Sequence, residues 1–440
     1  MRLVFVENRG KTVFWSAVAQ HLAADGHGVG WIVQNPTYRP NGAPGDVFDL
    51  GFPKAADLVA APIPEAVSTD RGRQYFGAGS RHYTFYRGRI ADALDSLRPD
   101  AVIGEPTLMH ELLTIAECRK RSIPYLHPAM TRYPGGRFNI LDGDTQIPVA
   151  GSDDTWPAAR LSDLASAISE ARSLPSYMAK PPAMAARMRQ LRRVEAQART
   201  TLGWLRGDRF NTPSPARKIT LQRALKENLA AWTALARMPD GAGPIILYPL
   251  QMQPEANIDV WGRPYSNQVA LVRQLLAALP QNGRIAIKAN PKSKYEVSPE
   301  ILALARETDR VILLPLNRSM NDAQAVSTGV VTVSGTVGFE AVFGRGRCLS
   351  LRHPVLEYHL PEFHAHSPED AVARLLTDPQ AGRGSPARGA DLLAQLVSDS
   401  FEGTINEPTY DPNCLSPANL ARVTAAFGQV LDTLPLKAVA

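Results

Sequence analysis

Two runs of short apolar strands alternating with amphipathic helices most limit how this chain can fold. In the first run, Leu3–Val6 and Val29–Val33 are separated by a helical pattern over Thr12–Ala24. The second run begins at Pro244–Tyr248 and continues to about residue 351. Because parallel strands need a crossover helix between them, this alternation predicts a parallel sheet with helices on both faces. Two runs predict two doubly wound α/β domains, which 440 residues can form.

The segment between the runs has a different composition. It is rich in Ala, Arg and Leu, and its pattern predicts helices near 160–172, 183–205 and 217–237. Between Lys180 and Lys226 there are twelve Lys or Arg residues against two acids. Such a segment is either a solvated helical face or a surface for anionic partners, in particular a membrane surface through 180–226. No RNA- or DNA-binding motif accompanies the segment, so we expect no nucleic-acid partner.

These patterns divide the chain into four predicted parts. They are an N-terminal α/β domain (1–150), a helical basic insertion or linker (151–240), a C-terminal α/β domain (241–380) and a C-terminal helical tail (381–440). The tail helix near 416–434 is expected to be able to pack back on the first domain.

Composition places the chain among ordinary globular proteins, with 44% hydrophobic and 20% charged residues. The three cysteines are far apart and have no CxxC spacing, which favours a reducing compartment over a disulfide framework. No apolar stretch reaches the roughly 18 to 20 residues of a membrane span. We therefore expect a cytoplasmic protein, with peripheral association at the inner membrane as a further expectation.

The sharpest local pattern is an apolar strand that ends in Ser334-Gly335-Thr336 directly before a helix. Backbone N–H groups at a helix N-terminus favour an anion, and Gly335 permits close approach because it lacks a Cβ. Glu340, about one turn into that helix, could reach a ribose hydroxyl. The alternative is an ordinary helix cap, because Ser and Thr are common capping residues. The pattern predicts a phosphate site at this loop.

Two further strand ends in the second run carry polar residues. Lys288 and Asn290 follow one strand, where a cation and an amide could meet a phosphate or a base. After the first strand of this run, polar residues alternate, which in an extended segment turns them to one side; they are Gln251, Gln253 and Glu255. Because ligands of open α/β sheets bind beyond the carboxyl ends of the strands, all three loops are predicted to line one donor site in a cleft between the domains. The alternative for Lys288 and Asn290 is an exposed strand end with ordinary solvated lysines, and the alternative for residues 251–255 is a polar turn after a core strand.

In the first run, a carboxylate stands at the end of each of two strands. These are Glu105 and Glu7, either of which could serve as catalytic base or nucleophile or merely cap a helix. Polar residues after the strand at 124–126 could contact the acceptor; they are His127, Arg132 and Arg137. The chain contains no GxGxxG, P-loop, HExxH or GxSxG motif, which argues against dehydrogenases, kinases, zinc proteases and hydrolases.

On these residues the C-terminal half resembles the bacterial capsule polysaccharide biosynthesis family, which includes β-Kdo transferases. The matching segments are Leu247–Glu255, Lys288–Pro291 and Val333–Ala341. The resemblance implies a GT-B fold and transfer of a sugar, such as Kdo, from a CMP- or UDP-linked donor to a surface polysaccharide, lipopolysaccharide or glycolipid acceptor. It implies no metal and no cofactor beyond the donor. Asn290 replaces the family's usual His, and an amide cannot become a cation.

Two other functions fit the same pattern. One is a UDP-sugar 2-epimerase-like enzyme, and the other is a non-catalytic protein that binds a sugar nucleotide or polysaccharide in capsule assembly. The sequence leaves the sugar, the acceptor and the stereochemistry open.

Overall fold

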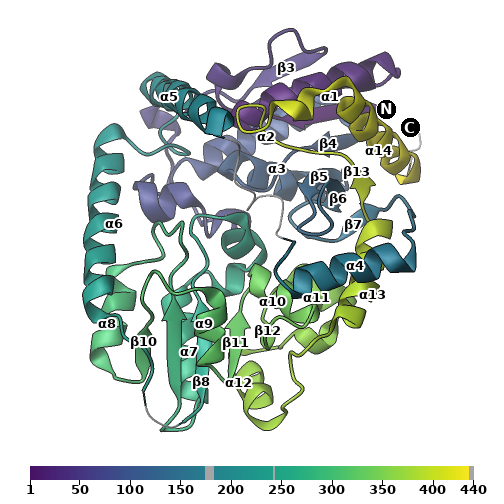
Figure 1. The fold of residues 1–440 in the computed structure, drawn as a ribbon. Coiled ribbons are helices and arrows are strands. Elements are labelled where there is room, and N and C mark those ends of the chain that lie inside the picture. Colours follow the sequence, from purple (N-terminus) through teal and green to yellow (C-terminus); the bar gives the residue numbers. More distant parts are fainter. Residues whose placement is uncertain (174–182, 241–242, 436–440) are drawn as a thin grey trace. The chain divides into compact units, whose positions relative to one another are not determined.

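The computed structural model describes residues 1–173, 183–240 and 243–435 (Figure 1). The chain forms two compact units, each built from segments that are distant in sequence. Unit 1 comprises Met1–Trp156, Leu174–Pro215 and Ala394–Ala440, and unit 2 comprises Pro157–Ser173 and Ala216–Leu393.

The sheet of unit 1 contains five parallel strands extended at one edge by antiparallel ones. The parallel strands are β1 (Arg2–Val6), β2 (Gly28–Val33), β3 (Asp46–Asp49), β4 (Ala101–Ile103) and β5 (Tyr125–Met130). The antiparallel strands are β6 (Arg137–Asp142), β7 (Pro148–Ala150) and β13 (Phe401–Glu402). In the order β13-β6-β5-β4-β1-β2-β3, the direction in which successive strands are added reverses between β1 and β4, which pair in parallel. In the register, Phe5 of β1 lies beside Trp31 of β2 and Ile103 of β4, and all three are fully buried, as expected of a sheet covered on both faces.

Helices cover both faces of this sheet. They are α1 (Thr12–Ala24), α2 (Tyr83–Leu97), α3 (Met109–Lys120) and α14 (Pro417–Thr433). The apolar side of α1, including Phe14 and Val18, shares one core with Phe427 and Val430 of α14, and the two helices lie side by side in Figure 1. The last helix of the chain therefore completes the core of the first sheet.

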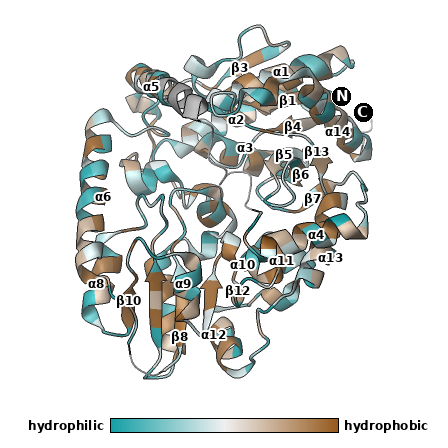
Figure 2. Cartoon of the chain, in the orientation of Figure 1, coloured by the Kyte–Doolittle hydropathy of each residue, from teal (hydrophilic) through white to brown (hydrophobic). Residues whose placement is uncertain are grey.

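The sheet of unit 2 is entirely parallel. Its strands are β8 (Ile245–Pro249), β9 (Arg284–Lys288), β10 (Val311–Leu313), β11 (Gly329–Thr332) and β12 (Cys348–Ser350). Their order is β10-β9-β8-β11-β12, and Figure 2 shows the strands as hydrophobic segments. The helices of this unit are α7 (Gln268–Ala278), α8 (Pro299–Glu307), α9 (Met320–Ala325), α10 (Thr336–Val342), α11 (Pro354–His359) and α12 (Pro368–Thr377), and α13 (Pro386–Ser398) leads back toward unit 1.

Numbered within each unit, both parallel sheets have the strand order 3-2-1-4-5, with the reversal between strands 1 and 4. This is the order of doubly wound nucleotide-binding folds. The prediction of two doubly wound parallel α/β sheets is confirmed.

The predicted helices between the two runs are present as α4 (Ala158–Ser169), α5 (Ala183–Arg206) and α6 (Pro215–Leu235). They do not form one body: α5 belongs to unit 1, whereas α4 and nearly all of α6 belong to unit 2. In α6, Trp232 is buried in the core of unit 2 and its Nε1 donates a hydrogen bond to the Leu314 carbonyl at 2.9 Å. Lys180 of the basic segment lies outside the described residues.

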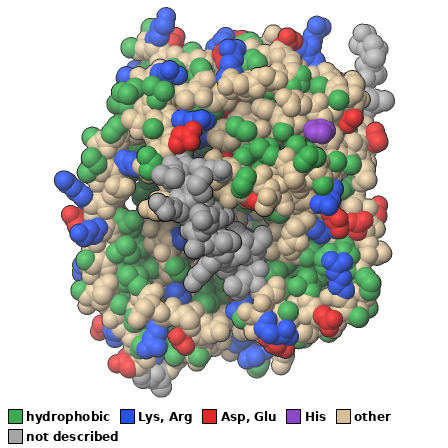
Figure 3. Space-filling model, turned by 45° about the horizontal axis from the view of Figure 1, so that its top comes forward, with side chains coloured by type: hydrophobic (Ala, Val, Ile, Leu, Met, Phe, Trp, Pro, Cys, Tyr) green, Lys and Arg blue, Asp and Glu red, His purple; other side chains and the backbone are tan. Residues whose placement is uncertain are grey.

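The antiparallel strands β6, β7 and β13 were not expected, nor was α13. Strand β6 lies between β5 and β13, so a segment near residue 140 is held by one near residue 401. Over the face shown in Figure 3, acidic and basic side chains are interspersed. No helix in the described part of the chain has the length and apolar character needed to cross a membrane.

Candidate functional site

In unit 2, the three predicted loops follow three adjacent strands. Strand β8 lies between β9 and β11, and all three run parallel, so their carboxyl ends meet at one edge of the sheet. The reversal of strand order falls between β8 and β11. In open α/β sheets this is the place where ligands bind.

Gln251 and Ser334 join two of these loops. In the amide orientation that satisfies its neighbours, the Gln251 oxygen accepts from the backbone N–H groups of Ser334 at 2.8 Å and Val333 at 3.0 Å. Its nitrogen donates to Ser334 Oγ at 3.0 Å, and that hydroxyl donates to the Asn257 carbonyl at 2.7 Å. Both side chains are buried. The Ser334 hydroxyl, predicted to bind phosphate, is therefore used to hold the loop together.

Gly335 and Thr336 form the transition from β11 to α10. A Cβ at Gly335 would lie 2.5 Å from Thr332 Oγ1, so only glycine fits here without displacement. The Gly335 N–H donates to the same Thr332 oxygen at 3.2 Å. Glu340, predicted to reach a ribose, forms an ion pair with Arg345 at 3.2 Å.

Of the polar residues after β8, Gln251 and Gln253 are buried and Glu255 is half-buried, so the three do not all face one open side. Gln253 Nε2 donates to Asp259 Oδ1 at 2.7 Å, and Gln253 Oε1 accepts from Gln268 Nε2 at 2.9 Å. The backbone N–H of Glu255 donates to Asp259 Oδ2 at 3.0 Å. These contacts give the loop a fixed shape, and they make Gln253 a structural residue of this loop.

Lys288, the last residue of β9, is a buried cation. Its side chain is among the buried groups, with 7% exposure for the residue, and Nζ has one contact at hydrogen-bond distance, the Ala289 carbonyl at 3.4 Å. No carboxylate of the described residues lies within ion-pair distance of Nζ, and burial lowers the pKa of this ammonium group. A buried charge without a counter-ion is costly, so this position favours an anionic ligand. Asn290 beside it accepts from Lys292 N at 2.8 Å and so shapes the turn.

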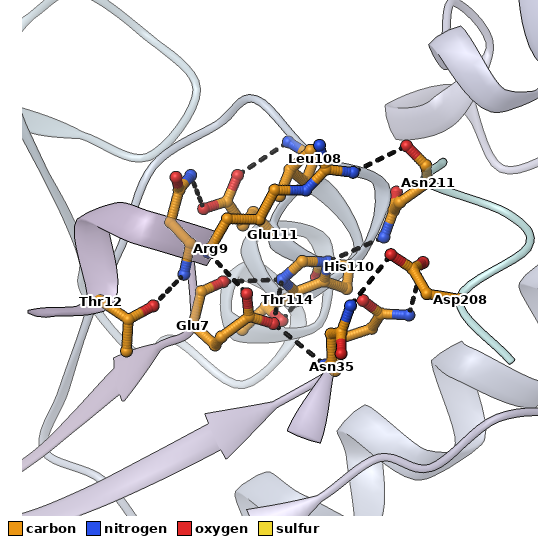
Figure 4. A network of polar contacts seen from close by, with 12 residues as sticks. Glu7, Arg9, Thr12, Asn35, Leu108, His110, Glu111, Thr114, Asp208 and Asn211 are labelled. Carbon is orange, nitrogen blue, oxygen red and sulfur yellow. Dashed lines mark hydrogen bonds and ion pairs between the residues drawn. The ribbon is translucent and has the colours of Figure 1, made fainter. Parts of the chain in front are cut away.

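In unit 1, Glu7 follows β1 at the corresponding reversal, between β1 and β4 (Figure 4). One carboxylate oxygen accepts from Arg9 N at 2.6 Å and the other from Asn35 N at 3.1 Å. His110 Nε2 lies 2.8 Å from the Glu7 carbonyl and 3.9 Å from its carboxylate. Burial is the main cause of a lowered pKa at His110, which favours the neutral ring. Glu7 is fully buried and held from several sides.

The loop after α5 supplies a second layer to this network. Asp208 Oδ2 accepts from Asn35 Nδ2 at 3.1 Å and from Thr212 Oγ1 at 2.8 Å. Asn211 Nδ2 lies 3.3 Å from His110 Nδ1, and the Asn211 carbonyl accepts from Arg9 Nη2 at 2.8 Å. Figure 4 shows these side chains converging around Glu7. We call residues 207–212 the support loop.

The residues of the support loop were not predicted as part of a site. The signal that could have found them is an acid and two uncharged polar residues inside an otherwise basic segment; these are Asp208, Asn211 and Thr212. Such residues are expected to be solvated, but all three are buried.

Glu105, at the end of β4, is more accessible than Glu7. Its side chain retains 13% exposure and forms an ion pair with Lys11. Nearby, the buried carboxyl of Glu111 accepts from Leu108 N at 2.7 Å and from Asn8 Nδ2 at 2.7 Å. Burial, followed by the charge of Glu105, raises the pKa of Glu111. Of the carboxylates at this edge, Glu105 is the better placed to exchange a proton with a ligand.

The three predicted acceptor-side residues have different surroundings. His127 is buried in β5, and burial followed by the charge of Lys11 lowers its pKa to about 3. Arg132 lies after β5 and is half-buried. Arg137 is buried in β6, where it pairs with Asp154 at 2.6 Å and donates to the Val397 carbonyl at 3.0 Å. Arg137 therefore anchors the C-terminal segment.

No protein-family model and no curated protein matches the chain. Several solved structures are similar to the chain at low identity and low TM-score. KpsC of Thermosulfurimonas dismutans, a β-Kdo 2,7 transferase, is 10% identical over 92% of this chain and 93% of its own, with a TM-score of 0.36. UDP-GlcNAc 2-epimerase of Methanocaldococcus jannaschii is 14% identical over 90% and 99%, with a TM-score of 0.27. The calicheamicin glycosyltransferase CalG4 is 12% identical over 99% of each chain, with a TM-score of 0.25. Likenesses this distant assign no role to any residue of this chain.

Proposed function

We propose that this protein is a metal-independent glycosyltransferase that moves a sugar from a nucleotide-activated donor to a polysaccharide or lipid-linked acceptor. The observation that carries the proposal is Lys288, a buried ammonium group without a carboxylate partner among the described residues, at the ligand-binding edge of a doubly wound sheet. A donor phosphate would supply the missing negative charge.

The proposed donor site uses groups at the carboxyl ends of β9 and β11. Lys288 would bind the phosphate, Gly335 would let it approach the backbone, and Thr336 would offer a hydroxyl at the start of α10. As the bond between sugar and phosphate oxygen breaks, negative charge grows on the leaving phosphate. A fixed ammonium group stabilises that charge most in the transition state. Lys288 would thus supply the positive charge that a metal ion supplies in other enzymes.

The proposed base is Glu105 of unit 1. Its carboxylate is partly exposed and paired with Lys11, whereas Glu7 is buried and its two oxygens already accept backbone hydrogen bonds. Glu105 would accept the proton of the acceptor hydroxyl while that oxygen forms the new bond to the sugar. Glu7 would position the loops at the end of β1.

The acidic sugar Kdo, carried by CMP, is the donor that the sequence resemblance favours, and the acceptor would lie at the inner face of a membrane. The geometry of the described residues leaves CMP- and UDP-linked donors equally eligible.

The proposal is tested by calorimetric titration with a panel of CMP- and UDP-sugars, followed by turnover assays with and without polysaccharide or glycolipid acceptors. We expect at least one donor to bind and its sugar to appear on an acceptor. Isomerised donor without any acceptor would instead identify a 2-epimerase. Binding without turnover would identify a non-catalytic sugar-nucleotide protein, and no binding across the panel would refute all three.

A further inference from the structure

Helix α5 carries an apolar stripe on its exposed side. The stripe consists of Val194, Leu202 and Leu205, whose exposed fractions are 66%, 41% and 64%. Their spacing of eight and three residues places them on one side of a helix with 3.6 residues per turn. Exposed apolar side chains that line up in this way differ from the isolated ones found on any surface.

The opposite side of α5 packs against the rest of unit 1. A Cβ at Gly203 would lie 2.8 Å from Asn35 Nδ2, so the helix backbone lies close to the residue that holds Glu7. Thr200 Oγ1 lies 3.4 Å from the hydroxyl of Tyr38, in the short helix η2 (Pro36–Tyr38). The docked side of the helix is therefore already used, and the stripe points away from it.

Basic side chains flank the stripe. Arg199 and Arg206 lie on one side of it, and Arg209 follows in the support loop, where its guanidinium lies 5.5 Å from the Trp204 ring centroid. The only exposed acid of α5 with a described side chain is Glu195, which pairs with Arg199 at 2.8 Å. Because Glu195 pairs with Arg199, the positive charge beside the apolar stripe comes from Arg206 and Arg209.

We infer that α5 is a docking helix for an anionic lipid surface. An amphipathic helix with basic residues beside its apolar face lies in the plane of a membrane, with the apolar side chains at the boundary between headgroups and acyl chains. The arginines would then meet the negative charges of the headgroups. A second copy of the chain fits less well, because a twofold contact through this stripe would bring Arg199 and Arg206 close to the same positive residues.

The inference that α5 docks on a lipid surface rests on the proposed function, and it adds where the enzyme would find its acceptor. The support loop begins directly after α5, and its Asp208 and Asn211 hold Asn35 and His110 around Glu7. A lipid surface that binds α5 would therefore lie next to an element that is continuous with the carboxylate site of unit 1. A lipid-linked acceptor would be concentrated near that site.

The experiment is co-sedimentation of the full chain with vesicles of phosphatidylcholine alone or mixed with phosphatidylglycerol. We expect binding to the anionic vesicles only, weakening as salt is raised. The variant Leu202→Ser/Leu205→Ser should lower vesicle affinity by about tenfold or more, and Arg206→Gln by about fivefold. The control Val59→Ser/Ile63→Ser removes two exposed apolar side chains elsewhere in unit 1 and should bind as the wild type does.

Equal binding by the leucine variant and the wild type, or equal binding to neutral and anionic vesicles, would overturn the inference. So would a concentration-dependent dimer that the leucine variant loses, since that would assign the stripe to a second copy. Donor affinity is measured on the same samples. A change in vesicle binding that leaves donor binding intact bears only on the inference about α5. Absence of donor binding in the wild type bears on the proposed function instead.

Discussion

The two sheets share a strand order, yet opposite charges stand at their ligand-binding edges. In unit 2 the edge holds Lys288, a buried cation without a carboxylate partner among the described residues. In unit 1 the corresponding edge holds the carboxylates of Glu7 and Glu105, of which Glu105 pairs with Lys11. The same scaffold thus offers a candidate anion site in one unit and candidate bases in the other. The comparison teaches that strand order sets where a site lies, while the residue after each strand sets its chemistry.

The largest effect is expected from Glu105→Gln. If the edge of unit 1 supplies the base, the rate of sugar transfer should fall by about 10² to 10⁴-fold, because an amide cannot accept the proton. Donor affinity should change little. The assay is steady-state transfer with saturating donor, and Glu65→Gln, an exposed acid of the same unit, is the matched control. Full activity of Glu105→Gln, with loss in a stable Glu7→Gln protein, would move the role to Glu7.

The edge of unit 2 is tested by Lys288→Met. Removing the ammonium group should weaken donor binding by about 10- to 100-fold, as expected for a charge-assisted hydrogen bond. The unliganded protein should be at least as stable as wild type, since a buried charge without a counter-ion is removed. Titration calorimetry and thermal melting measure the two effects, and Lys292→Ala, an exposed lysine four residues on, is the control. Unchanged donor affinity would mean that Lys288 does not bind the donor, and the proposed difference in charge between the two edges would then have no role in ligand binding.

Gln251→Leu tests whether the edge of unit 2 depends on the hydrogen bonds that Gln251 makes between two of its loops. The backbone N–H groups of Val333 and Ser334 would lose their acceptor, which should cost about 1–3 kcal/mol of unfolding free energy. Denaturant unfolding measures this loss, and the exposed Gln222→Leu in α6 should leave stability near wild type. An unchanged midpoint in Gln251→Leu would show that the loop does not depend on this bridge.

The smallest effect, and one confined to unit 1, is expected from His82→Phe. The ring of His82 is stacked on the ring of Phe210 in the support loop, with 4.2 Å between the ring centroids. Its two nitrogens have no hydrogen-bond partner among the described residues. Burial lowers the pKa of His82 from 6.5 to about 4. Between these values the unfolded chain binds a proton that the folded chain does not, so stability falls as the pH falls from 6.5 toward 4.

In His82→Phe this contribution should vanish, which stabilises the protein at pH 5 by on the order of 1 kcal/mol relative to wild type and changes little at pH 7.5. Melting temperatures of both proteins at the two pH values measure it. An identical pH dependence in variant and wild type would mean that His82 binds a proton equally well in the folded and unfolded chains.

Much of the fold could be predicted because short apolar strands and helical periodicity are local patterns. Leu3–Val6 and Pro244–Tyr248 were placed within a residue or so of the observed strands β1 and β8. Strand β13 could not be predicted, because its two residues carry no pattern of their own and pair with Phe138 and Arg137 from far away in the sequence. Local patterns do not encode which distant segments pair.

The site was predicted less well than the fold, for a related reason. The positions of Lys288 and Glu105 at strand ends followed from the sequence, but the partners that decide their chemistry did not. Gln251 was expected to face a ligand, yet its amide is used by backbone N–H groups that would otherwise be unpaired. From the sequence, Asp208 is expected to be a solvated acid in a basic segment. In the structure it is buried and accepts a hydrogen bond from Asn35.

The position of α14 has a consequence for the order in which the molecule is made. Strands β1 to β5 of unit 1 are synthesised before the strands of unit 2, yet the core of unit 1 needs Phe427 and Val430, and Arg137 needs the carbonyl of Val397. Unit 2 is complete in sequence at Leu393, before those residues are synthesised. Because domains fold as units during synthesis, the middle of the chain can mature first. Strands β1 to β5 then remain with one face of their sheet uncovered until α14 is synthesised.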